Sequence, residues 1–148
     1  MAIPTLTADG FLPVGIHDAT LEEVGRVFGR FRSSDRRVTL FGRLQQYISD
    51  LQAWGNAIAI LIDGSFTSAA ILPNDIEMIV IYEAGFDFSA ERVPEEYNVI
   101  DSRRIRRRYG LDVVSVATDS PEEARWIRFF QRDRRRLSKM KGLVRISL

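Results

Sequence analysis

Residues 58–82 read Ile-Ala-Ile-Leu-Ile-Asp-Gly-Ser-Phe-Thr-Ser-Ala-Ala-Ile-Leu-Pro-Asn-Asp-Ile-Glu-Met-Ile-Val-Ile-Tyr. Two apolar runs, 58–62 and 76–81, are separated by a Gly-Ser pair at 64–65 and a Pro-Asn pair at 73–74. Short aliphatic runs bounded by such turn residues indicate strands of a sheet that is covered on both faces. The stretch therefore predicts two strands, over residues 57–63 and 75–82, at the centre of an α/β domain.

Two acidic residues, Asp75 and Glu77, stand at the start of the second predicted strand. Side chains two residues apart in a strand project from the same face, so these carboxylates would lie together. Neighbouring like charges repel, and acids are depleted from strands. A divalent cation would relieve that repulsion and give it a function. The alternative is that the pair is solvated at a strand entrance and that Gly64-Ser65 is only a turn and helix cap.

Patterns elsewhere in the chain predict helices and two more strands around this centre. Helices are expected over residues 20–28, 36–54, 65–70, 94–97, 102–109 and 121–132. Strands are expected over 111–117 and, at a sheet edge, over 141–146, whereas residues 1–16 are expected to form an extended arm. The 148 residues suit one domain. We therefore predict a single α/β domain spanning 1–148, with a mixed sheet of about four to five strands flanked by helices.

The composition of the chain excludes several kinds of site and several classes of protein. There is no cysteine and one histidine, which excludes disulfides and a multi-histidine zinc site within the chain. No apolar run is long enough to span a membrane, and the first residues do not have a secretory pattern. A cytoplasmic protein is therefore expected. Residues 1–100 carry 7 Arg/Lys and 14 Asp/Glu, whereas residues 101–148 carry 14 and 6, so the second half could bind a polyanion.

The Gly64-Ser65 turn, followed about ten residues later by Asp75-Ile76-Glu77, resembles the active-site signature of the nucleotidyltransferase superfamily (DNA polymerase beta-like). The wider strings at 63–67 and 73–77 resemble a small bacterial branch of minimal nucleotidyltransferases. Residues 11–17 and 141–146 also resemble that branch, so the likeness reaches both ends of the chain as well as its centre.

That resemblance implies a metal-dependent enzyme that moves a nucleoside monophosphate from an NTP to a hydroxyl of a protein, an RNA or a small molecule. Asp75 and Glu77 would hold two Mg²⁺ or Mn²⁺ ions. A third carboxylate usually comes from a neighbouring strand in such enzymes, and Asp112 is the candidate that this architecture implies. Catalysis would consist of positioning and charge neutralisation at the α-phosphate.

The resemblance also implies phosphate binding by Gly64, Ser65 and Thr67, since N–H groups at a helix N-terminus favour anions. Two arginine clusters could steer an NTP or RNA phosphates toward the site. They comprise Arg103, Arg104, Arg106, Arg107 and Arg108, and then Arg132, Arg134, Arg135 and Arg136. The alternative for the first cluster is a solvated helix face paired with the acidic segment 83–96.

Two function classes remain open, an active nucleotidyltransferase and a catalytically degenerate fold that acts as an antitoxin-like partner or nucleotide sensor. Minimal superfamily members often work with a partner subunit, including a small helical ribonuclease-type toxin. The opposite charges of the two halves and the aromatic stretch 126–130 predict a homodimer or hetero-complex. Alternatively, those aromatic side chains pack on the sheet. His17 is expected to be structural, and Trp54 and Trp126 are expected to be core residues.

Overall fold

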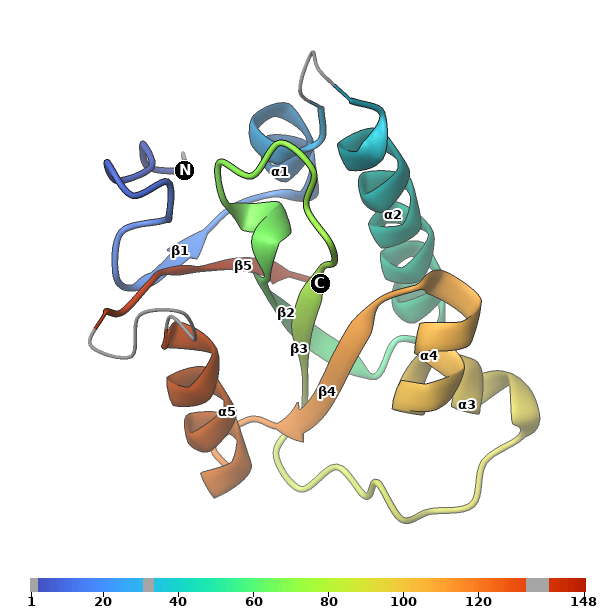
Figure 1. Ribbon diagram of the computed structural model, residues 1–148. Coiled ribbons are helices and arrows are strands. Elements are labelled where there is room, and N and C mark those ends of the chain that lie inside the picture. The colour runs from blue at the N-terminus through green and yellow to red at the C-terminus, as the bar shows by residue number, and fades with distance from the viewer. Residues whose placement is uncertain (1–2, 31–33, 133–138) are drawn as a thin grey trace.

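A five-stranded mixed β-sheet runs through the molecule in the order β1-β5-β2-β3-β4 (Figure 1). The structure, a computed structural model, describes residues 3–30, 34–132 and 139–148. The strands are β1 (Ile16–Asp18), β2 (Ala57–Asp63), β3 (Glu77–Tyr82), β4 (Asp112–Ala117) and β5 (Leu143–Ser147). With helices on both faces, this sheet confirms the predicted α/β fold class.

The two central predicted strands are neighbours, since β2 pairs antiparallel with β3, and β3 pairs parallel with β4. On its other side β2 pairs antiparallel with β5, which in turn pairs parallel with β1. The predicted edge position of the last strand is therefore wrong. A three-residue strand directly after the expected arm takes the edge instead, and so short a segment carries no readable periodicity.

The helices flank the sheet on both sides. They are α1 (Leu21–Phe28), α2 (Arg36–Trp54), α3 (Pro94–Ile100), α4 (Ser102–Tyr109) and α5 (Pro121–Gln131). Thr20 caps α1 by accepting a hydrogen bond from the Glu23 N–H at 3.1 Å, as the capping box predicts. Within the described ranges, no helix combines the length and apolar character needed to cross a bilayer.

The helix expected over 65–70 is only a single 3₁₀ turn, η1 (Ser65–Thr67). Ser68 is extended, and its hydroxyl donates to the Ser65 carbonyl at 2.6 Å and accepts from the Ala70 N–H at 3.2 Å. A side chain that bonds to nearby backbone in this way competes with helix propagation. The prediction for this segment was therefore too long.

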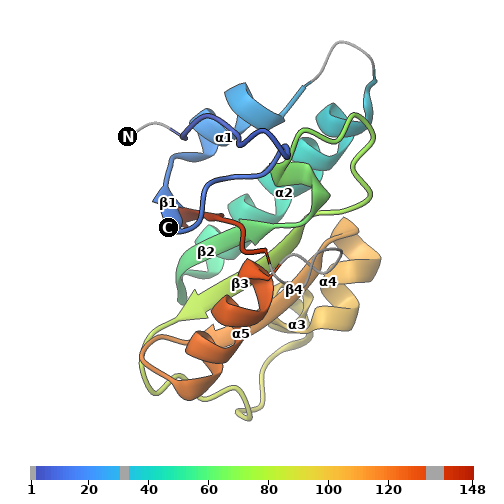
Figure 2. The ribbon, with the colours of Figure 1, turned by 60° about the vertical axis from the view of Figure 1, so that its left-hand side comes forward.

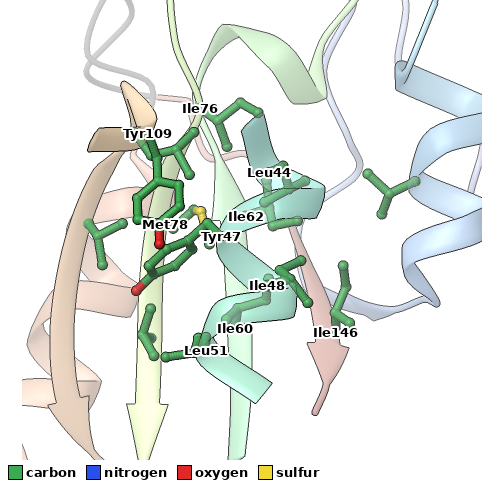
Figure 3. Packing of buried hydrophobic residues seen from close by; sticks show 14 of the residues in the cluster. Leu44, Tyr47, Ile48, Leu51, Ile60, Ile62, Ile76, Met78, Tyr109 and Ile146 are labelled. Atoms are coloured by element: carbon green, nitrogen blue, oxygen red, sulfur yellow. The ribbon is translucent and has the colours of Figure 1, made fainter. Parts of the chain in front are cut away.

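Alternating side chains divide the sheet into two apolar layers. One layer faces α1, α2 and α4 and includes Ile60, Ile62, Met78 and Val80, packed against Leu44, Tyr47 and Leu51 of α2 (Figure 3). The other layer faces α5, whose Phe130 packs on it, and comprises Ala59, Leu61, Ile79, Ile81, Val116 and Leu143. Figure 2 shows α5 in front of the sheet and α2 behind it. Two covered faces explain why β2 and β3 are almost continuously aliphatic.

The N-terminal arm packs closely against the entrance to β5. His17 Nε2 donates to the Pro13 carbonyl at 2.7 Å. A Cβ on Gly142 would lie 2.0 Å from the same carbonyl oxygen, so only glycine lets the chain pass there. The contact gives His17 a structural role in holding the arm beside β1.

Candidate functional site

The three predicted acids lie together at the ends of adjacent strands. Asp75, Glu77 and Asp112 each offer a carboxylate oxygen, and these atoms lie within 4.8 Å of one another. The register pairs Glu77 with Asp112 across β3 and β4, which directs both side chains to the α5 face of the sheet. Asp75 precedes β3 rather than belonging to it, which corrects the predicted start of that strand. The predicted convergence of three carboxylates is nevertheless confirmed; we call them the acid cluster.

The Gly-Ser turn lies directly against the acid cluster. Gly64 has φ 91°, and a Cβ there would lie 3.1 Å from both Asp75 Oδ1 and the Glu77 nitrogen. Glycine therefore supplies both the backbone conformation and the close approach. Ser65 Oγ accepts a hydrogen bond from the Asn74 N–H at 2.8 Å, which ties this turn to the one that precedes Asp75.

An open cleft of about 690 Å³ begins at this turn, and we call it the Gly-Ser cleft. Its lining includes Gly64, Ser65, Ser68, Ile71, Leu72, Asn74, Asp75, Glu77 and Lys141, with Asp9, Gly10 and Phe11 from the N-terminal arm. The cleft thus combines backbone and hydroxyl groups, carboxylates, one cation and several apolar side chains. Its volume is in the range of small-molecule sites.

Thr67 does not lie in the Gly-Ser cleft, although the sequence placed it among the phosphate-binding residues. Its side chain is buried, and its hydroxyl donates to the Gly64 carbonyl at 3.3 Å. Its N–H donates to the same carbonyl. Thr67 therefore stabilises the turn through its hydrogen bonds to Gly64, whereas Gly64 and Ser65 line the cleft.

A buried arginine holds the segment that forms one wall of the cleft. Arg37 of α2 is fully buried, and its guanidinium donates to the carbonyls of Phe28, Phe66, Ser68 and Ala70 at 2.6–3.2 Å. Burial lowers the pKa of Arg37 to about 10, which leaves it charged at neutral pH. Its neighbour Arg36 donates to the carbonyls of Pro73 and Asn74 at 2.9 and 2.6 Å. Sequence reasoning missed both because a polar first turn of a helix is ordinarily solvated.

A second feature that the sequence did not reveal is an ion pair between Lys141 and Asp63, whose charged atoms lie 2.9 Å apart. The Asp63 side chain is 2% exposed and that of Lys141 is 16% exposed. Asp63 ends β2 next to Gly64, so the ion pair brings a cation from the entrance to β5 into the Gly-Ser cleft. The carboxylate at the end of a buried strand could have indicated that Asp63 needs a cationic partner. The sequence did not identify Lys141 as that partner, because the two residues are far apart in the chain.

Replacing Lys141 with methionine is expected to lower the free energy of unfolding by about 3 kcal/mol, because the buried Asp63 carboxylate would lose the cation that lies 2.9 Å from it. The double variant Lys141→Met with Asp63→Asn should recover most of that loss. Urea denaturation of the two variants and the wild type measures both effects. Equal stability of the single and double variants would show that the buried Asp63 charge is not the source of the loss.

The first arginine cluster divides between structural and site positions. Arg104 donates to the Pro94 carbonyl and lies over the Tyr97 ring, and Arg108 lies over Tyr109. Arg106 contacts the Asp112 carboxylate and, with Arg103, lines a second groove beside the acid cluster. Arg107 is exposed on the same helix. In the second cluster, residues 134–136 lie outside the described residues.

Most of the aromatic stretch 126–130 packs on the sheet. Phe130 is 5% exposed, and Trp126 and Ile127 pack partly against the same apolar layer. Phe129 is 47% exposed, with its ring centroid 5.5 Å from that of Trp126. Trp54 packs on Tyr82 at 5.8 Å, in agreement with the predicted core role. Association with a second chain stays a prediction.

Comparison with known proteins adds one relationship to this geometry. The model of a family of unknown function, DUF6932, matches residues 4–147. The chain belongs to this family. No curated protein and no solved structure matches the chain. Membership in DUF6932 carries no activity with it.

Proposed function

We propose that this protein is a metal-dependent nucleotidyltransferase that moves a nucleoside monophosphate from an NTP to a hydroxyl group. The observation that carries the proposal is the acid cluster, with three carboxylate oxygens within 4.8 Å, set against the Gly64-Ser65 turn in an open cleft. The carboxylates of the acid cluster stand at the entrances to β3 and β4, whereas the Gly64-Ser65 turn follows β2. Their meeting at one point is what a phosphoryl-transfer site needs.

The donor set suits a hard divalent cation. Carboxylate oxygens are the ligands that Mg²⁺ and Mn²⁺ prefer, and Mg²⁺ typically takes one or two of them together with substrate phosphates. Asp75, Glu77 and Asp112 would hold such ions. When bound, they supply charge neutralisation on the triphosphate and acidify the attacking hydroxyl.

The chain's own groups would place the donor nucleotide. Gly64, Ser65 and Lys141 all line the Gly-Ser cleft, so the backbone N–H groups of the turn and the Lys141 ammonium would hold the triphosphate. Phe11, Ile71 and Leu72 offer apolar surface to the nucleoside in the same cleft. The α-phosphorus would then lie at the acid cluster.

The transfer conserves atoms and charge. The acceptor oxygen forms a bond to the α-phosphorus, while the bond between that phosphorus and the oxygen bridging to the β-phosphate breaks. The bonding electron pair leaves on pyrophosphate. The hydroxyl proton passes to a carboxylate oxygen of the acid cluster and then to water. The protein's contribution is alignment and electrostatics.

One observation favours a second candidate function, nucleotide binding without transfer. Arg106 contacts Asp112, so a guanidinium competes with any cation for the third carboxylate. A nucleotide sensor or antitoxin-like partner would bind a nucleotide in the Gly-Ser cleft without needing all three carboxylates as metal ligands.

Counting bound Mn²⁺ by electron paramagnetic resonance, with a non-hydrolysable NTP analogue present, tests the proposal. The wild type is expected to bind about two ions per chain. Asp112→Asn should lose one of them, and the control Glu91→Gln, an exposed acid in a loop, should bind as the wild type does. Absence of analogue-dependent Mn²⁺ binding in the wild type would contradict the proposal, and equal counts in wild type and Asp112→Asn would favour the sensor.

A further inference from the structure

A second concave surface of about 320 Å³ lies beside the acid cluster, between α4, β4 and α5. We call it the aromatic groove. Trp126, Phe129 and Phe130 line it on the α5 side, and Arg103 and Arg106 line it on the α4 side. The Trp126 ring stands edge-on to Phe129 and to Phe130, at interplanar angles of 85° and 81°. Apolar ring surface and two guanidinium groups therefore face one space.

The aromatic groove and the Gly-Ser cleft meet at the acid cluster. Glu77 lines both, Asp75 lines the cleft, and Asp112 lines the groove. A transfer reaction brings two substrates to one point from different directions. The Gly64-Ser65 turn and Lys141 make the cleft the side for the triphosphate, which leaves the groove as the side from which the acceptor arrives.

We propose that the aromatic groove binds the 3′-terminal nucleotide of a single-stranded nucleic acid, whose hydroxyl is the acceptor. The base would lie against the rings of Trp126 and Phe129, and the backbone phosphate would contact Arg103 and Arg106. This inference rests on the proposed transferase function and names its substrate class.

The chemistry of the groove matches a nucleotide more closely than an amino-acid side chain. Bases stack on aromatic rings whatever their identity, and guanidinium groups bind phosphate through paired N–H donors. A serine or tyrosine acceptor carries no phosphate that would use the two arginines. The volume of the groove suits one nucleotide.

Arg106 has a specific part in this arrangement. It contacts Asp112 here, and an arriving phosphate offers it a second anion. Transfer of the guanidinium to that phosphate would free the third carboxylate when the acceptor is present. Arg106 is therefore a positioning residue that couples the groove to the acid cluster.

Fluorescence anisotropy of a short 5′-labelled oligonucleotide tests the assignment, with Mg²⁺ present and NTP absent so that no transfer occurs. RNA and DNA versions share the base and phosphate chemistry, and both are measured. Phe129→Ala and Arg103→Ala are each expected to weaken binding about tenfold, because a stacking surface or a phosphate contact is lost. Arg107→Ala, which removes the same charge from the same helix outside the groove, should weaken binding by no more than about twofold.

Binding of Mn²⁺ and NTP analogue, measured on the same variants, distinguishes a failure of the groove assignment from a failure of the proposed transferase function. Phe129→Ala and Arg103→Ala should bind them as the wild type does. A wild type that binds the analogue but no oligonucleotide overturns the groove assignment alone, whereas one that binds neither overturns both proposals. An equal loss in Arg107→Ala would show general attraction to the basic helix, and weakened analogue binding in Phe129→Ala would place the donor base in the groove. Either result overturns the assignment.

Discussion

Replacing Arg37 with alanine is expected to lower the free energy of unfolding by about 4 kcal/mol. Its guanidinium serves four buried or partly buried carbonyls, those of Phe28, Phe66, Ser68 and Ala70. Each carbonyl left without a donor costs about 1 kcal/mol or more. The cavity left by a fully buried side chain adds to that cost.

Urea denaturation of Arg37→Ala, Arg37→Lys and the exposed control Arg107→Ala measures the effect. Lysine keeps the charge but lacks the planar guanidinium with its several N–H donors. The free energy of unfolding of Arg37→Lys should therefore lie between those of Arg37→Ala and the wild type. Arg107→Ala should stay within about 0.5 kcal/mol of the wild type. A loss below about 1 kcal/mol in Arg37→Ala would contradict the view that this residue holds the wall of the Gly-Ser cleft.

The carbonyls that Arg37 binds lie close to the candidate site. Phe66, Ser68 and Ala70 belong to the segment between η1 and the turn before Asp75, and Arg36 holds the end of the same segment. The two arginines at the start of α2 thus fix the path from the Gly-Ser turn to the acid cluster. Arg37→Lys, where it remains folded, is expected to bind Mn²⁺ and NTP analogue more weakly than the wild type.

The parts of the fold that could be predicted are those with long, regular patterns. The strand over 57–63 and the helix over 36–54 have the expected bounds, because continuous aliphatics and a three-and-four spacing persist over many residues. The convergence of Asp75, Glu77 and Asp112 was also predictable. The spacing of two residues at the entrance to β3 predicted that the first two would lie together, and the architecture of the family that the sequence resembles supplied the third.

The parts that could not be predicted depend on tertiary partners. β1 is three residues long and pairs with β5 at the other end of the chain. Likewise, the local hydropathy does not reveal a partly buried Lys141 beside Asp63, or a guanidinium that donates to backbone carbonyls. Such contacts are long-range and use residue types that are ordinarily exposed. Three of the groups that shape the Gly-Ser cleft, Arg36, Arg37 and Lys141, were missed for this reason.

Neutralising Asp75 is expected to have opposite effects with and without divalent metal. In a chelating buffer, carboxylates within 4.8 Å of one another repel by about 1 kcal/mol, so Asp75→Asn should melt about 3 °C above the wild type. With Mn²⁺ and NTP analogue at about 100 times the dissociation constant, the wild type should gain about 2.7 kcal/mol, or about 8 °C. Asp75→Asn should gain little, because it lacks a metal ligand while nearly keeping the shape of the side chain.

Thermal denaturation tests whether the acid cluster is the metal site, with wild type, Asp75→Asn and the control Glu91→Gln each measured in chelator and in Mn²⁺ with NTP analogue. We expect the order of melting temperatures to reverse: Asp75→Asn melts highest in chelator and lowest in metal with analogue, and Glu91→Gln follows the wild type in both. Equal stabilisation of wild type and Asp75→Asn by metal and analogue would show that the acid cluster is not the metal site.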